Sequence, residues 1–215
     1  MVNVIILSET EDMSSLNELY QQIAQCFKCE IAKSRCKVVP GEGAENADII
    51  FIGEAPGLHE DQQGRPFVGQ AGQFLDRLLA SINLQRQQVY IANVIKCRPP
   101  DNRDPLPTEI QNCHQWLDSQ IEIIKPKMIV TLGRYSMARY FPGKSISKIH
   151  GTAVKHDNVI YYAMYHPAAA LHQQSLRQAI EADMLKIPKL LAEARNVQEV
   201  KPSASGGQQL NMFEV

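Results

Sequence analysis

Asp48-Ile49-Ile50-Phe51-Ile52 decides the fold, because this short apolar run passes directly into a turn rich in glycine and proline, Gly53–Gly57. A continuous apolar run of this length, ended by turn residues, is typical of a parallel strand that is buried on both faces. The chain holds three more such runs, at Val89–Asn93, Lys127–Leu132 and Val159–Met164. The sequence therefore predicts four buried parallel strands.

Segments with helical spacing lie before, between and after these runs. Apolar residues recur every three or four positions over Leu16–Ile23, which Ser14 or Ser15 can cap, and over Ile110–Ile124, which follows Pro107. Further helices are expected at Phe74–Ile82, at Tyr135–Tyr140 and, with an interruption at Pro188, at Ser175–Ala194. Strands that alternate with helices predict the α/β class, with a doubly wound parallel sheet and right-handed crossovers.

The size and composition suit one domain. The chain has 215 residues, of which 44% are hydrophobic, and its net charge is −1, which is enough for a well-buried α/β domain. We assign that domain to residues 1–195 and a flexible tail to residues 196–215, because Lys201–Gly207 has the composition of a linker. The charge excludes a histone-like polycation, but a local basic stripe can still bind nucleic acid.

Neither a membrane span nor a signal peptide is expected. No run of about 18 apolar residues occurs, and Met1–Leu7 is short and lacks a basic flank. We therefore predict a cytoplasmic protein, and a monomer. In the cytoplasm cysteines are usually thiols or metal ligands rather than disulfides, and the odd number of five also disfavours a complete disulfide framework.

Four of the cysteines have the spacing of a metal site. Cys26 and Cys29 are separated by two residues, so their thiolates can hold one metal, and Cys97 and Cys113 can complete a set of four. Four thiolates suit zinc and an iron–sulfur cluster equally well. Alternatively, Cys113 is a core cysteine on its helix. Cys36 is interpreted as a bystander.

Unusual residues follow the predicted strands, where parallel sheets bind their ligands. Asn93 ends the second strand and can read a base edge with one donor and one acceptor, or simply form a turn. His166 follows the fourth strand and can donate a proton or a hydrogen bond, or be a structural histidine. Phe67 lies in the glycine-rich loop Gly53–Gly72, where its ring can stack on a nucleobase or plug the core.

Three basic residues lie close behind Asn93 in the sequence. Lys96, Arg98 and Arg103 can bind DNA phosphates, although single basic residues are more often solvated surface.

Taken together, these motifs resemble the iron–sulfur class of uracil-DNA glycosylases, known as family 4. The resemblance extends from Cys26 to the helix after His166. Its order and spacing make it specific, and its motifs are Cys26-x-x-Cys29, Val38–Gly43, Gly53–Gly57, Gly64–Gly72, Asn93–Pro100 and His166–Ala168.

The resemblance implies a fold, a cofactor and roles for residues. The fold is a three-layer α/β/α arrangement around a central four-stranded parallel sheet. The cofactor is a [4Fe–4S] cluster on the four cysteines Cys26, Cys29, Cys97 and Cys113, which favours iron over zinc. The residues expected to bind uracil are Glu54, Ala55, Pro56, Phe67, Asn93 and His166, with Glu54 and His166 also catalytic.

The implied reaction is the hydrolysis of the N-glycosidic bond of uracil in DNA, with release of uracil and formation of an abasic site. The base must leave the duplex to be reached, and Leu171 is expected in the DNA-inserting loop. Cluster-free relatives carry an Asp as water activator where this chain has Ala55, so Glu54 first and Glu60 second are expected to position the water. No lysine nucleophile is evident, which predicts a monofunctional enzyme of base excision repair.

The tail carries a second motif. Gln209-Leu210-Asn211-Met212-Phe213 resembles the short peptide with which bacterial repair and replication proteins bind the sliding clamp. A linker before it suits a tethered peptide that orders on binding. The sequence therefore predicts a clamp contact through Gln209, Leu210, Met212 and Phe213.

Two alternative functions fit the same sequence. One is a non-catalytic nucleic-acid-binding module with a structural metal site, which would release no base from uracil-containing DNA. The other is a glycosylase on the same fold for other deaminated bases, which would release deaminated purines at least as efficiently.

Overall fold

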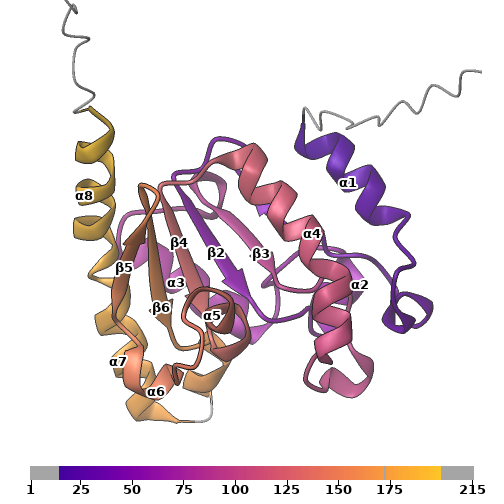
Figure 1. Ribbon diagram of the computed structural model, residues 1–215. Coiled ribbons are helices and arrows are strands. Elements are labelled where there is room, and N and C mark those ends of the chain that lie inside the picture. The colour runs from indigo at the N-terminus through magenta and orange to yellow at the C-terminus, as the bar shows by residue number, and fades with distance from the viewer. Residues whose placement is uncertain (1–14, 172, 200–215) are drawn as a thin grey trace, which may run out of the picture.

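Four parallel strands form the centre of the sheet in the computed structural model, which describes residues 15–171 and 173–199 (Figure 1). They are β2 (Ile49–Gly53), β3 (Tyr90–Asn93), β4 (Met128–Leu132) and β6 (Val159–Met164). Their order is β3-β2-β4-β6, and every neighbouring pair is parallel. These strands confirm the four predicted runs.

Two short antiparallel strands extend the sheet at its edges to six, beyond the four that were expected. β1 (Glu42–Gly43) pairs with β3, and β5 (Ala153–His156) pairs with β6. The turn between β5 and β6 holds Asp157 and Asn158 at φ values of 47° and 65°, the positive values that a two-residue hairpin of the right twist requires.

The helices lie before, between and after these strands and match the predicted α/β pattern. Ser15 caps the first, since its Oγ accepts from the Glu18 N–H at 3.3 Å. The α-helices are α1 (Leu16–Ala24), α2 (Leu58–Gln63), α3 (Gln70–Ser81), α4 (Pro107–Ile124), α5 (Arg134–Tyr140), α6 (Ile146–Ile149), α7 (Gln174–Met184) and α8 (Ile187–Glu199). The 3₁₀ turns are η1 (Glu30–Lys33), η2 (Arg86–Gln88), η3 (Pro100–Asn102) and η4 (Pro167–Leu171).

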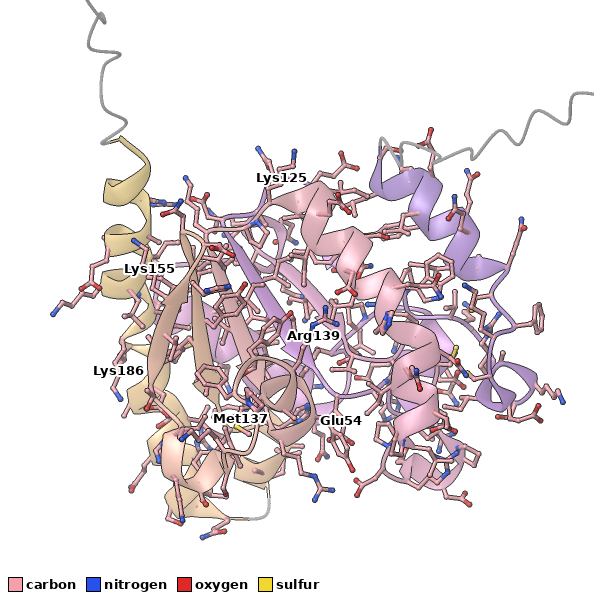
Figure 2. All side chains as sticks on the ribbon, viewed as in Figure 1. Glu54, Lys125, Met137, Arg139, Lys155 and Lys186 are labelled. Atoms are coloured by element: carbon pink, nitrogen blue, oxygen red, sulfur yellow. The ribbon has the colours of Figure 1, made fainter. Side chains whose placement is uncertain are left out.

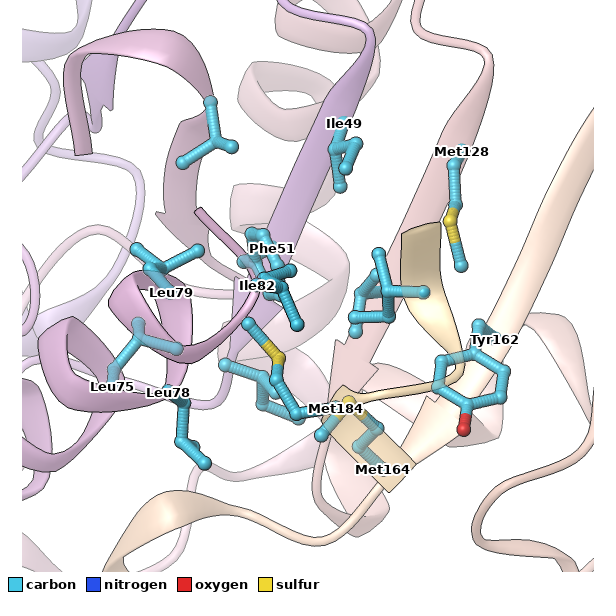
Figure 3. Packing of buried hydrophobic residues seen from close by; sticks show 14 of the residues in the cluster. Ile49, Phe51, Leu75, Leu78, Leu79, Ile82, Met128, Tyr162, Met164 and Met184 are labelled. Atoms are coloured by element: carbon cyan, nitrogen blue, oxygen red, sulfur yellow. The ribbon is translucent and has the colours of Figure 1, made fainter. Parts of the chain in front are cut away.

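Side chains that alternate along β2 divide the core into two layers, as the period of a strand dictates. Ile49 and Phe51 pack into one cluster with α3, α7 and α8, and Figure 3 shows Phe51, Leu75 and Met184 among its members. Ile50 and Ile52 pack into the other, with α1 and α4. The sheet is therefore covered on both faces, and the architecture is the expected three-layer α/β/α arrangement.

The predicted helix Ser175–Ala194 is two helices, α7 and α8, with Pro188 in the first turn of α8, where a missing N–H costs no hydrogen bond. Arg195 fixes α8 to the amino-terminal edge of the sheet, because its Nε lies 2.8 Å from Oδ2 of Asp48. The helix runs to Glu199, past the predicted boundary at residue 195. The predicted clamp peptide lies outside the described residues. None of the helices described here has the length and apolar character to cross a membrane.

Candidate active site and metal centre

A pocket of about 260 Å³ opens beyond the carboxyl ends of β2, β3 and β6, where ligands bind in sheets of this kind. All six residues that the sequence predicted to bind the base line it. Glu54, Ala55 and Pro56 follow β2, Asn93 ends β3, and His166 follows β6. The geometry thus brings together side chains that are more than a hundred residues apart in the chain.

Gly53 lets two of these side chains meet behind the pocket. A Cβ at this position would lie 2.4 Å from Oδ1 of Asn93 and 2.6 Å from Cζ of Phe67. Real Cβ atoms essentially never make non-bonded contacts this short, so any side chain at Gly53 must displace Asn93, Phe67 or both. A glycine at the end of β2 is therefore a requirement of the pocket.

Asn93 lines the pocket and carries an unsatisfied acceptor. Its side chain is 2% exposed, and its Oδ1 is buried without a hydrogen-bond partner. A buried polar atom left unpaired costs free energy unless a ligand pairs with it. A ligand N–H group that reaches this oxygen would satisfy it.

The imidazole of His166 is neutral and carries its proton on Nε2. The backbone N–H of Ala168 donates to Nδ1 at 3.1 Å, so Nδ1 is an acceptor and Nε2 carries the proton. Burial lowers the pKa of His166 to about 4, an effect that the charge of Glu60 opposes. The ring also stacks on Phe67, with 5.5 Å between centroids. At neutral pH His166 is a neutral hydrogen-bond donor.

The two glutamates of the pocket differ in their surroundings. Burial raises the pKa of Glu54, and Asp104 adds to that rise while Arg134 opposes it; Figure 2 shows Glu54 just beyond β2. Glu60 instead accepts three backbone N–H groups, from Val68 and Gly69 at 2.8 Å and from Gly57 at 3.1 Å. Glu60 therefore joins two loops through these hydrogen bonds. Because its oxygens are already engaged, Glu54 is the better placed carboxylate to bind a water.

Four cysteines line a second, much smaller cavity, of about 10 Å³, between α1, η1, α4 and the loop after β3. They are Cys26, Cys29, Cys97 and Cys113, the predicted set. Nη1 of Arg35 donates to Sγ of Cys97 at 3.2 Å, and the backbone N–H of Lys96 donates to Sγ of Cys113 at 3.3 Å. Burial raises the pKa of Cys97, and raises that of Cys113 to about 11. Cys36 is exposed and does not line this cavity.

Comparison with known proteins identifies the family. Residues 40–189 match the uracil DNA glycosylase superfamily. A type-4 uracil-DNA glycosylase of Sulfurisphaera tokodaii is 46% identical over 188 residues, 83% of this chain and 86% of that protein. The type-4 enzymes of Archaeoglobus fulgidus and Thermotoga maritima are 44% and 41% identical, over 83% and 77% of this chain and 94% and 89% of theirs. The chain belongs to the uracil DNA glycosylase superfamily.

One residue assignment for this superfamily member is corrected by the structure. Lys96 was predicted to bind a DNA phosphate, but its side chain is 1% exposed. Its Nζ donates to the backbone oxygen of Asn93 at 2.9 Å and to Oε1 of Gln120 at 2.7 Å. Lys96 therefore holds the base of the Asn93 loop from inside and is not available to DNA.

The two arginines predicted to contact DNA have partners within the protein. Arg103 lines the pocket, but its guanidinium forms a bidentate pair with Glu109, at 2.6 and 2.9 Å. Nε of Arg98 donates to Asn102 at 2.7 Å. Leu171, at the end of η4, is 44% exposed, as a side chain that enters DNA must be. Contacts with DNA remain predictions for all three.

Two features of this glycosylase-family site escaped the sequence analysis. The Ala168 N–H sets the tautomer of His166, and nothing in the residue type of Ala168 could have indicated it. Arg86 contacts the loop of Phe67 from nineteen residues away in the chain, and it lies in no recognisable motif.

Proposed function

We propose that this chain removes uracil from DNA by hydrolysing the N-glycosidic bond of a flipped nucleotide, releasing uracil and leaving an abasic site. The single observation that carries the proposal is the buried, unpaired Oδ1 of Asn93 in a pocket shared with Phe67 and His166. The type-4 relatives, similar over most of the chain, support the same activity.

Recognition of the base follows from the pocket's donors and acceptors. Uracil carries an N–H at N3, which can donate to Oδ1 of Asn93, whereas cytosine has a bare acceptor there and would leave both atoms unpaired. The ring of Phe67 offers a flat apolar face for stacking. This hydrogen bond therefore distinguishes uracil from cytosine.

Bond cleavage places charge where the pocket can stabilise it. When the bond between C1′ and N1 breaks, its electron pair leaves with uracil, which becomes an anion, and the sugar becomes cationic. The Nε2–H of His166 is preorganised to donate to the uracil oxygen that gains charge. Glu54, a half-buried carboxylate at the same pocket, accepts the proton of the water that adds to C1′.

A base-release assay tests this function. Wild-type protein, purified without air, is expected to release free uracil from an oligonucleotide with one deoxyuridine and nothing from matched cytosine or thymine strands. Asn93→Ala is expected to lower the rate by about 10- to 100-fold, the worth of a well-placed base contact. No release by the wild type would favour a non-catalytic binding module, and equal release of hypoxanthine would favour the broader glycosylase.

We also propose that the four cysteines hold a [4Fe–4S] cluster, which would supply a structural cross-link. No three His, Cys, Asp or Glu side chains within residues 15–171 and 173–199 form a group fit for one metal ion. The four thiols nevertheless surround one cavity, and a cluster spreads its cysteines because each binds a different iron. This arrangement suits a cluster better than zinc.

The charge around the cavity also suits an anionic group. The ammonium of Lys96 is buried and bonds only to neutral oxygens, of Asn93 and Gln120. Burial lowers the pKa of Lys96 to about 8, an effect that Cys113, Asp118 and Cys97 oppose, and Asp118 already pairs with Arg139. A buried cation is costly without a counter-charge, and cluster-bound thiolates would provide one.

The tail supports a third, independent proposal, a contact with the bacterial sliding clamp. Deleting Gln209–Val215 is expected to weaken clamp binding and to leave uracil release unchanged, because the pocket lies in the folded domain. Calorimetric titration of the clamp measures the first effect and the base-release assay the second. An unchanged affinity for the clamp would refute the contact.

A further inference from the structure

Phe67 adopts a backbone conformation that aromatic residues avoid. Its φ is 52°, in the left-handed region, and its side chain is 5% exposed. A bulky residue in this region is a strained outlier that persists only where its surroundings impose it. Because the ring forms a wall of the pocket, whatever imposes this conformation also places the stacking surface.

Arg86 donates hydrogen bonds to the peptide groups on both sides of Phe67. Its Nη1 donates to the Phe67 carbonyl at 3.0 Å, and its Nη2 donates to the Pro66 carbonyl at 2.6 Å. A guanidinium offers several donors in one rigid plane, so it can fix two successive carbonyls at once. The Arg86 side chain is 13% exposed, and water therefore competes little for these bonds.

Arg86 is itself held in place. Its Nη1 lies 3.0 Å from Oδ1 of Asp76, and its Nε lies 3.6 Å from Oε1 of Glu42. Arg86 opens η2, the turn that leads into β3 and so toward Asn93. Asp76, Glu42 and the short helix η2 thus orient the guanidinium toward the loop.

Two further contacts hold the residues that follow Phe67. Glu60 binds the N–H groups of Val68 and Gly69 from the pocket side. Gly72 lies so close that a Cβ there would fall 1.8 Å from the Phe67 carbonyl oxygen. Of these contacts, Arg86 alone binds the carbonyls of the strained residue and of the residue before it.

We propose that Arg86 is a positioning residue that holds Phe67 in its strained conformation and thereby sets the affinity of the pocket for the uracil ring. The inference rests on the proposed function and deepens it. Arg86 lines no part of the pocket, so it acts on the base only through Phe67.

A double-mutant cycle separates this role from a merely structural one. Arg86→Met removes the donors, Arg86→Lys keeps the charge without the planar fork, and each is also made in a Phe67→Leu background. Arg65→Met is the matched control, because the Arg65 side chain donates to the same Glu42 but to neither the Pro66 nor the Phe67 carbonyl. The readout is the inhibition constant of free uracil in the base-release assay.

Arg86→Met is expected to raise the uracil inhibition constant about tenfold, the size of a typical coupling between contacting residues. Arg86→Lys should recover part of this loss, and Arg65→Met should stay within about twofold of the wild type. In the Phe67→Leu background Arg86→Met should change the constant by less than about twofold. The same factor in both backgrounds, or no change in either, would overturn the proposal.

A second measurement does not need catalysis. Chymotrypsin cuts after phenylalanine, and release of the loop in Arg86→Met and Arg86→Lys should speed cleavage after Phe67 relative to Arg65→Met. If the folded Arg86 variants and Arg65→Met are cleaved at equal rates, Arg86 does not position Phe67. If the wild type releases no uracil, the proposed function fails while this proteolysis still decides whether Arg86 positions Phe67.

Discussion

His166→Ala is expected to lower the single-turnover rate of uracil release by about 10²- to 10³-fold, the cost of losing one preorganised donor at a developing oxyanion. The donor is well defined here, because Ala168 fixes the proton on Nε2. Rapid-quench measurement of base release gives the rate. His114→Ala is the matched control, since His114 is exposed on α4 beside Asp118. Its replacement should leave the rate of uracil release unchanged.

The pH dependence of the same reaction checks the protonation state. With a pKa of about 4, His166 stays neutral from pH 8 down to pH 5, so its titration should cause no fall in rate near 6.5. The pH dependence of the stability that this group contributes is opposite in sign to that of a salt-bridged histidine. Because the unfolded ring takes up a proton near 6.5 and the folded ring does not, stability from this group is full above 6.5 and is lost as pH falls toward 4. A rate that drops with a midpoint near 6.5 in the wild type but not in His166→Ala would contradict this assignment.

Cys97→Ala is expected to destabilise the fold by about 4 kcal/mol or more, the class of effect caused by loss of a structural metal site. Cys97 follows Asn93 by four residues, while Cys26 and Cys29 follow α1 and Cys113 lies in α4. A cluster on these sulfurs would join three separate segments of the chain. DNA binding should weaken with stability, although no acid or base of the reaction is removed.

Iron and sulfide content, the brown absorbance and the melting temperature together measure this effect. Cys36→Ala is the matched control and should retain all three, because Cys36 lies outside the cavity. Full iron content and an unchanged melting temperature in Cys97→Ala would show that Cys97 is not a ligand. Zinc in a colourless wild-type protein would instead replace the cluster by a single-ion site.

The buried strands could be predicted because burial on both faces leaves a continuous apolar signature. β2 has such a signature, and its predicted and observed bounds differ by one residue. β5 does not, since it is largely exposed at the sheet edge and only the Asp157-Asn158 turn marked it. β1 is two residues long, and its close approach to Val89 depends on Gly43. Short edge strands are set by their neighbours and leave little trace in composition.

The pocket could be predicted in part because strand ends converge in a parallel sheet. That rule, with the family resemblance, brought Glu54, Asn93 and His166 to one place. It could not distinguish a solvated lysine from a buried one, so Lys96 was assigned to the surface. It also could not find Arg86, whose contacts arise from folding rather than from any spacing. A sequence shows which side chains carry charge, but it does not show which of them are buried or which groups they contact.

The ion pair between Arg195 and Asp48 has a consequence for how the protein can be handled. It ties the last described helix to the edge of the sheet where the parallel strands begin, whereas the pocket opens where they end (Figure 1). A fluorophore, an affinity tag or a solid support joined after α8 would therefore be anchored at the opposite pole from the pocket. Immobilised enzyme attached this way should keep its full rate on DNA supplied in solution.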